Sequence, residues 1–394
     1  MNKTLSFFCL LSFSLILHSQ QQNILTNGIT SIKIQQVLLE GEDYRPYPEY
    51  TNRTFWEGLP DSIQQMFMAR GEELLDYKWP ALPATLILDY IRTGNRHHFQ
   101  AIADNKRQAL FRLMLAELVE GKGRFLDQIL NGVWSVNEES TWVYSAHIGQ
   151  GSARGGLPDV TNPYVDLMSA EMATLVSLAY FFFGDQFDAV SPQINQRIKH
   201  EVQKRVLIPA YENEFWWMGF NTSDRRPNNW NPWICSNWMM ANFLIEDDPE
   251  VKAKYTYKIL QVLDNFLNPY PPDGGCDEGP SYWNAAAGAL FDNLVLLNKA
   301  TNDYFSQAYE NDLIRNMGTY IKKVHIGNGY FVNFADAGPK ANPGWEVLYH
   351  YGKKINDAGM MDFGGCRFKN EDFIPGTWHI HRFFFFFFCI VRQQ

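Results

Sequence analysis

A helical repeat of apolar residues is the feature that most limits how this 394-residue chain folds. One apolar stripe recurs mostly at spacings of three and four residues, which places it on one face of a helix; its members are Val165, Met168, Met172, Leu175, Val176 and Ala179. Similar patterns, separated by short Gly/Pro breaks, begin at about Leu59 and predict helices over residues 62–77, 96–120, 194–211, 230–245, 251–266, 280–298 and 302–324. Strand-like alternation is scarce before Gly329, so the chain is expected to be all-α and built from helical hairpins.

The composition fits a folded and acidic protein. Hydrophobic residues make up 46% and charged residues 20%, which favours a globular chain over a disordered one. The net charge of −9 argues against a nucleic-acid partner, because such a partner calls for a basic surface. Aromatic residues reach 15%; most are expected in the core, and some are expected to stack on sugar rings.

The chain begins with a pattern typical of a secretory signal peptide. Lys3 precedes the apolar stretch Leu5–Leu17, so residues 1–20 predict export to the periplasm or medium, with no membrane attachment after cleavage. Residues 21–54 are polar and are expected to form an extended lead-in, and no other segment is expected to approach a membrane span. The five cysteines are widely spaced and match no zinc pattern, so buried free thiols are favoured.

A turn at residues 273–283 carries the first candidate site. Gly274-Gly275 and Gly279-Pro280 are turn signals, and proline is favoured at the first position of a helix. Tyr282 is then expected in the first helical turn, where free N–H groups and the helix dipole favour a phenolate. Tyr282 is therefore a candidate base, and simple packing of this side chain is the alternative.

A second motif runs from Asn228 to Trp233 and offers clustered amides and indoles. Together with Asp273-Gly, Glu278-Gly, Tyr282 and the stretch 331–337, it resembles heparinase II/III-type polysaccharide lyases. The resemblance spans about residues 45–380 and implies an (α/α) toroid over residues 55–362. A β-sandwich domain would begin at about residue 363, so residues 363–394 would be its truncated start. It also implies that Asn228 or Asn229 neutralises a uronate carboxylate and that Tyr282 acts as base, acid or both.

Further residues are expected around this site. Glu278 is expected to orient Tyr282 or hold the loop, whereas Asp273 is expected only to cap the helix start and favour its dipole. The expected substrate-binding residues are Trp230, Trp233, His147, Arg154 and Arg226. No cofactor is expected in this chain: the family's metal site belongs to the sandwich domain, and His379 with His381 supply too few ligands for a closed site.

The six phenylalanines at 383–388 are hard to place in a packed domain and form an aggregation-prone run. We hypothesise that the reading frame shifts in the codons for this run, which resequencing would test. The chain is then expected to be a weak or inactive lyase, since the cleft would lack one wall.

The leading interpretation is a lyase that cleaves acidic, heparin- or heparan-like or related polysaccharides by β-elimination. One alternative is an inverting glycoside hydrolase on an (α/α) toroid, which would use two carboxylates about 6.5–9.5 Å apart. These would come from Asp273, Asp277 and Glu278 plus a distant acid. The other alternative is an inactive glycan-binding remnant, which would bind without turnover.

Overall fold

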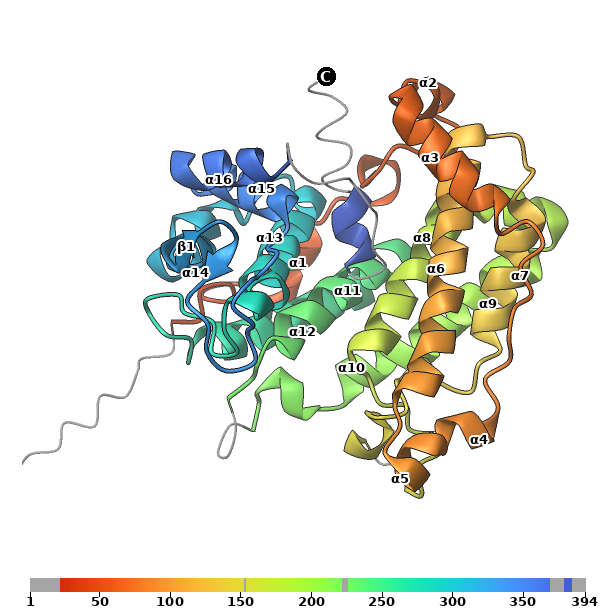
Figure 1. Cartoon of the computed structure of the whole chain (residues 1–394), viewed down its shortest axis with the longest axis horizontal. Coiled ribbons are helices and arrows are strands. Elements are labelled where there is room, and N and C mark those ends of the chain that lie inside the picture. The colour runs from red at the N-terminus through yellow and green to blue at the C-terminus, as the bar shows by residue number, and fades with distance from the viewer. Residues whose placement is uncertain (1–21, 152–153, 222–225, 369–378, 385–394) are drawn as a thin grey trace, which may run out of the picture.

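The computed structural model describes residues 22–151, 154–221, 226–368 and 379–384. This part of the chain is mostly helical, which confirms the all-α prediction (Figure 1). Its only strands are the short β1 (His325–Gly327) and β2 (Tyr330–Phe331), which pair as an antiparallel hairpin. The expected signal peptide lies outside the described residues.

The longer helices in the first half of the chain pack against one another in pairs. Helix α3 packs on α6, α6 on α7, and α8 on α9. The helices are α1 (Ser31–Val37), α2 (Arg53–Glu57), α3 (Asp61–Glu72), α4 (Ala84–Ile87), α5 (Asp89–Thr93), α6 (His97–Glu120), α7 (Leu126–Asn137), α8 (Leu167–Val190), α9 (Pro192–Val202) and α10 (Ile208–Glu212). Short 3-10 turns cover Gly41–Asp43, Ile148–Gln150 and Trp216–Met218, and a π-helical segment covers Gln203–Leu207.

The second half continues the same pattern from the middle of the molecule. Helix α11 packs on α8, α12 and α13, and α15 packs on α14 and α16. The helices are α11 (Trp230–Ile245), α12 (Pro249–Leu267), α13 (Ala289–Ala300), α14 (Asp312–Lys323), α15 (Trp345–Lys354) and α16 (Ala358–Phe368). Short 3-10 turns cover Pro280–Tyr282 and Ser306–Glu310, and a second π-helical segment covers Asn284–Gly288.

Helix α8 lies at the centre of the core. Asp166 caps its start through a capping box with Ser169, which satisfies N–H groups that a helix start otherwise leaves unpaired. By length and composition α8 would suffice to cross a membrane, contrary to our expectation that no such segment follows the signal. However, 83% of its most apolar window is buried inside the structure, which is the position of a core helix.

Two end regions differ from the sequence-based expectation. The lead-in is not simply extended: it contains α1, and Ile34 of that helix is fully buried because α1 packs on α12. At the other end, residues 363–368 belong to α16, and 380–384 are helical instead of β. Most of the phenylalanine run lies outside the described residues.

The segment 379–384 lies between the two halves of the molecule (Figure 1). Phe384 is fully buried, with its ring centroid 5.3 Å from that of Tyr47 and 5.0 Å from that of Phe182 in α8. Arg382 reaches the opposite side, where it pairs with Asp292 of α13. The segment thereby connects the early helices to the late ones.

Candidate functional site

The 273–283 turn is held in a conformation that requires glycine. Gly279 has a φ of 88°, and a Cβ atom there would lie 2.6 Å from both the Phe334 carbonyl oxygen and the Ala337 Cβ. The turn therefore packs directly against the 331–337 stretch. Asp273 accepts a hydrogen bond of 2.9 Å from the Gly275 N–H, so it stabilises the turn itself and does not cap the helical start at Pro280, which was the role expected for it.

Tyr282 follows this turn at the end of a 3-10 turn and not inside the first turn of an α-helix. Pro280 opens that 3-10 turn, as its missing N–H favours, and the chain then passes through the π-helical segment 284–288 before α13 begins. The Tyr282 side chain is half-buried and packs against the core. The neighbouring Trp283 is fully buried and donates its indole N–H to the Met317 carbonyl, which fixes this end of the turn.

Glu278 joins the two sequence motifs. Its carboxylate accepts hydrogen bonds from the side-chain amides of Asn228 (Nδ2 to Oε1, 2.9 Å) and Asn229 (Nδ2 to Oε2, 2.8 Å). The Asn228 oxygen in turn accepts the Trp230 backbone N–H at 3.1 Å, which sets the orientation of that amide. Segments about fifty residues apart along the chain therefore meet at one carboxylate.

The carboxylates around this point control its electrostatics. Partial burial raises the pKa of Glu278, the charges of Asp277 and Asp336 raise it further, and the two asparagine amides oppose the shift. Burial also raises the pKa of Tyr282 above its usual 10.0, helped by the charges of Glu278 and Asp336. The helix dipole was expected to favour the phenolate of Tyr282, but burial and the two carboxylates raise its pKa instead.

Arg226 lies at the edge of the site, whereas no contact joins Arg154 to the Glu278 junction among the described residues. Arg226 forms an ion pair of 2.7 Å with Asp277 and lies over the Tyr270 ring. Arg154 is exposed and donates to the Gly151 carbonyl at 3.2 Å. The basic edge of the site is therefore partly neutralised by the chain itself.

His147 lies beside the same motif through Trp230. Its Nδ1 is 2.7 Å from a carboxylate oxygen of Asp166, which selects one orientation of the buried ring. The His147 and Trp230 ring centroids are 4.7 Å apart, and Trp216 packs on Trp230 at 5.2 Å. His147 therefore belongs to an aromatic wall that begins directly after Asn229.

Trp233 faces a different environment from the one expected for a sugar platform. Its indole N–H donates to Glu171 at 2.7 Å, and its ring stacks on His379 with centroids 4.7 Å apart. A side chain of the same protein therefore covers this indole face. The sequence did not reveal this contact, because His379 lies far along the chain.

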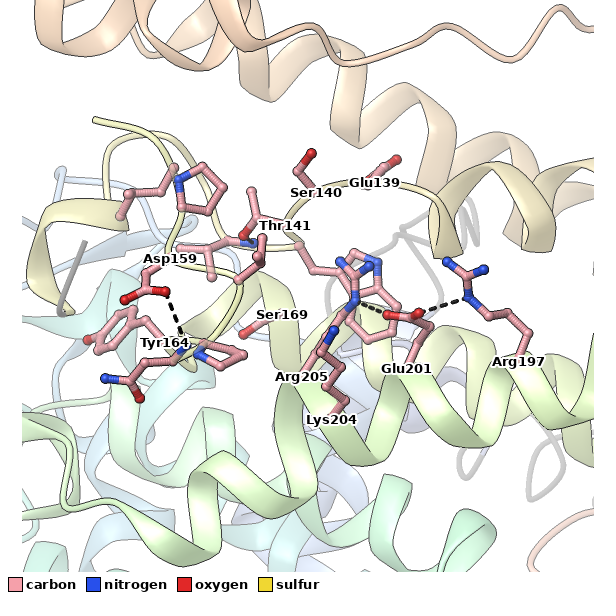
Figure 2. A pocket seen from close by; sticks show the side chains of 17 residues that line it. Glu139, Ser140, Thr141, Asp159, Tyr164, Ser169, Arg197, Glu201, Lys204 and Arg205 are labelled. Carbon is pink, nitrogen blue, oxygen red and sulfur yellow. Dashed lines mark hydrogen bonds and ion pairs between the residues drawn. The ribbon is translucent and has the colours of Figure 1, made fainter. Parts of the chain in front are cut away.

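A cavity of about 200 Å³ lies near the aromatic wall and is lined by Trp142, Ile148 and Tyr164, among others (Figure 2). Its two arginines, Arg197 and Arg205, both pair with Glu201, at 2.8 and 2.5 Å. None of the residues at the Glu278 junction lines it.

Sequence reasoning missed Asp166 and Asp336, whose effects on His147 and Tyr282 depend on tertiary packing. The only sequence signal for Asp166 was its place directly before an apolar helix, which marks a cap. No protein-family model matches the chain, and no curated protein matches it, so the geometry of the site carries the functional proposal.

Proposed function

We propose that this protein is a polysaccharide lyase that cleaves uronate-containing glycans by β-elimination. The observation that carries the proposal is the junction at Glu278, where the Asn228 and Asn229 amides meet the turn that bears Tyr282. Two amides beside a tyrosine suit a substrate that carries a carboxylate next to an acidic C–H group. The proposed frame is an (α/α) toroid of the helical hairpins, in an exported protein.

The amides have donor capacity left for a substrate. A side-chain amide carries two N–H groups, and each asparagine directs one of them to Glu278. The second N–H group of each amide has no acceptor among the described residues and is proposed to bind a uronate carboxylate. Hydrogen bonds to that carboxylate would stabilise the negative charge that develops when the C5 proton leaves.

Tyr282 is proposed to move the proton. Its phenolate removes the C5 proton, the C4–O bond breaks as the double bond forms, and the phenol returns the proton to the leaving oxygen. Because the pKa of Tyr282 is raised, only a small fraction is phenolate at neutral pH. Activity is therefore expected to increase with pH until the phenolate predominates.

The aromatic wall supplies a surface for the sugar rings. Trp230 follows the two asparagines directly, and His147, oriented by Asp166, packs against it. Sugar rings present apolar C–H faces that pack on indoles. We propose that this wall holds the unit next to the cleaved bond, and that Arg226 attracts the acidic chain towards the cleft.

A hydrolase remains the second candidate because of one observation. The pKa of Glu278 is raised, as a general acid requires, and the charge of Asp336 acts on it. Glu278 and Asp336 would then be the acid and base of an inverting enzyme. Asp277 and Asp273 fit less well, because Arg226 and the Gly275 N–H already occupy them.

The test uses a panel of uronate-containing glycans at high protein concentration and long incubation. A lyase forms unsaturated uronates, which absorb ultraviolet light, whereas a hydrolase forms new reducing ends without that absorbance. We expect the unsaturated product, its loss in Tyr282→Phe with binding retained by calorimetry, and no change in the control Tyr304→Phe, which alters an exposed tyrosine. Reducing ends without absorbance, lost in Glu278→Gln, would establish the hydrolase instead.

A further inference from the structure

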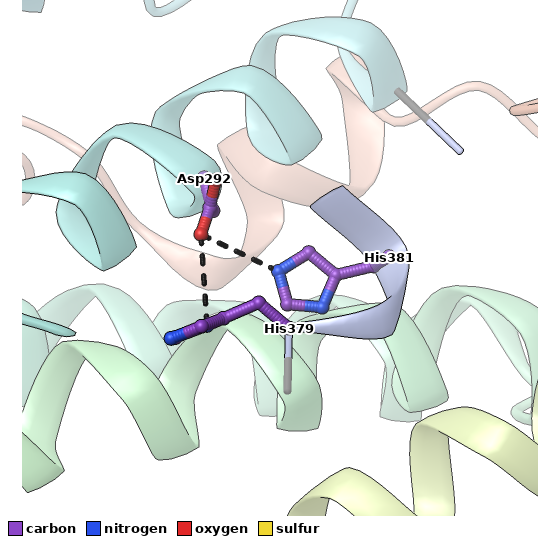
Figure 3. Close-up of side chains that lie close together, drawn as sticks. All are labelled: Asp292, His379 and His381. Atoms are coloured by element: carbon purple, nitrogen blue, oxygen red, sulfur yellow. Dashed lines mark ion pairs between the residues drawn. The ribbon is translucent and has the colours of Figure 1, made fainter. Parts of the chain in front are cut away.

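A group of buried ionisable side chains lies away from the proposed cleft junction, between α13 and the segment 379–384. It comprises Asp292, His379 and His381, and one potential ligand atom from each lies within 4.8 Å of the others (Figure 3). An Asp292 oxygen is 3.9 Å from His379 Nδ1 and 3.6 Å from His381 Nε2. All three residues are buried, so bulk water does not solvate them.

Three of the four imidazole nitrogens of this group lack hydrogen-bond partners in the part of the chain that the structure describes. His379 Nδ1 and both ring nitrogens of His381 are buried without a partner among the described residues. An unpaired buried polar atom costs about 1–3 kcal/mol, so three in one place need an explanation. A bound cation would satisfy the lone pairs that face Asp292.

Two buried carboxylates and two buried arginines set the charge around the group. Asp292 and Glu171 are both fully buried. Arg382 donates to Asp292 through Nε at 3.1 Å and through a terminal nitrogen at 2.6 Å. Glu171 accepts the His379 backbone N–H at 2.8 Å with one oxygen, and its other oxygen is buried without a partner among the described residues. Arg382 therefore pairs with Asp292, whereas the charge of Glu171 acts on a second buried guanidinium, that of Arg107.

We propose that Asp292, His379 and His381 bind a divalent transition-metal ion of the zinc type. Two imidazoles and one carboxylate form a three-ligand set that zinc accepts, with a further position open. In a tetrahedral site with bonds of about 2.0–2.1 Å, ligand atoms lie roughly 3.3 Å apart, so the ligand atoms, now within 4.8 Å of one another, would have to approach by up to roughly 1.5 Å when the ion binds. Arg382 donates to Oδ2 of Asp292, the same oxygen that faces both histidines, so the ion would take the lone pair that this hydrogen bond leaves, and the guanidinium charge would lower the affinity.

The ion would act as a structural connection. Asp292 belongs to α13, and His379 contacts Glu171 and Trp233 on α8 and α11. A metal would thus fix the late segment between three helices. Two histidines are too few ligands for a closed site, and no sequence pattern pairs them with an aspartate some ninety positions earlier. This inference is independent of the proposed lyase activity.

The test starts with the full chain, stripped of metal by a chelator and dialysed. Titration with Zn²⁺ in a calorimeter is expected to show one site per chain, and Co²⁺ is expected to give the visible absorption of a four-coordinate ion. Loss of an outer partner typically weakens metal binding about 10- to 100-fold, so His379→Gln and His381→Gln should weaken it by more. The control His98→Gln, at an exposed histidine, should bind as the unmodified chain does.

Circular dichroism identifies any variant that fails to fold. If a variant is unfolded, the metal titration of the unmodified chain alone tests the proposal. A single Zn²⁺ site with a four-coordinate Co²⁺ spectrum supports the proposal. Absence of binding by the unmodified, folded chain would overturn it. Equal weakening by His98→Gln and His381→Gln would also overturn it, because the ion would then be bound at the surface.

Discussion

Replacing Glu278 by alanine should separate the asparagine pair from the turn that bears Tyr282. The change removes two hydrogen bonds, of 2.9 and 2.8 Å, from neutral amides to one carboxylate. Bonds to a charged group contribute about 1.5–3 kcal/mol each. Because Glu278 is only half-buried, water can hydrogen-bond to the freed amides and offset part of the lost stabilisation. The free energy of unfolding should therefore fall by about 2–4 kcal/mol.

Glu278→Gln should cost less, because one amide has freedom to rotate. The Trp230 N–H holds the Asn228 oxygen, so the Asn228 amide continues to donate to the glutamine oxygen. Asn229 has no such constraint among the described residues, and its oxygen is expected to turn and accept from the glutamine amide. Both hydrogen bonds then remain, and the free energy of unfolding falls only by what the charge of the acceptor contributes, about 1 kcal/mol.

Urea unfolding followed by circular dichroism measures both changes, with Glu310→Ala as the control at an exposed glutamate. The dependence on urea concentration should stay the same, so that a shift in midpoint reports stability alone. If Glu278→Ala lowers stability by less than about 0.5 kcal/mol, or by no more than Glu278→Gln, the two bonds do not hold the motifs together.

Three further changes test other parts of the structure. Gly279→Ala should lower the free energy of unfolding in urea by about 1–3 kcal/mol, because φ is 88° and the new Cβ would contact Phe334 and Ala337. An unchanged free energy of unfolding would mean that the turn relaxes freely. Burial lowers the pKa of His350 from 6.5 to about 4, so its neutral form stabilises the fold above pH 6.5 and this contribution is lost as the pH falls towards 4. His350→Gln should remove up to about 3 kcal/mol of that acid sensitivity in unfolding measured across this range, and an unchanged pH dependence would contradict it. Lys106→Met should cost about 3–5 kcal/mol in the same unfolding assay, because it leaves Glu139 buried without its ion-pair partner, and a neutral result would show that water reaches Glu139.

The sequence predicted helices best where apolar spacing and end signals agree. Residues 230–245 match α11 at both ends. The expected single helix over 302–324 was wrong, because Asn302 and Asp303 adopt positive φ and Asn311 caps a new start at α14. The expected helix 194–211 contains Pro209, and the π-helical turn 203–207 accommodates it within one helical run.

Other elements depended on contacts that a sequence pattern does not reveal. Helix α1 forms in a polar stretch because it packs on α12, which buries Ile34. The sequence identified the residues of the candidate site by type, but not that both asparagines bind Glu278, nor that Asp336 acts on Tyr282. Those interactions arise from tertiary packing between segments that are distant in the sequence.

The pH dependence of turnover on a uronate glycan tests the role of Tyr282 most directly. With a phenolate base whose pKa is raised above 10.0, kcat/KM for the unsaturated product should increase about tenfold per pH unit between about pH 7 and 9. Tyr282→Phe should show no turnover at any pH in that range. A flat profile in the unmodified chain, or turnover retained in Tyr282→Phe, would contradict the assignment of Tyr282 as the base.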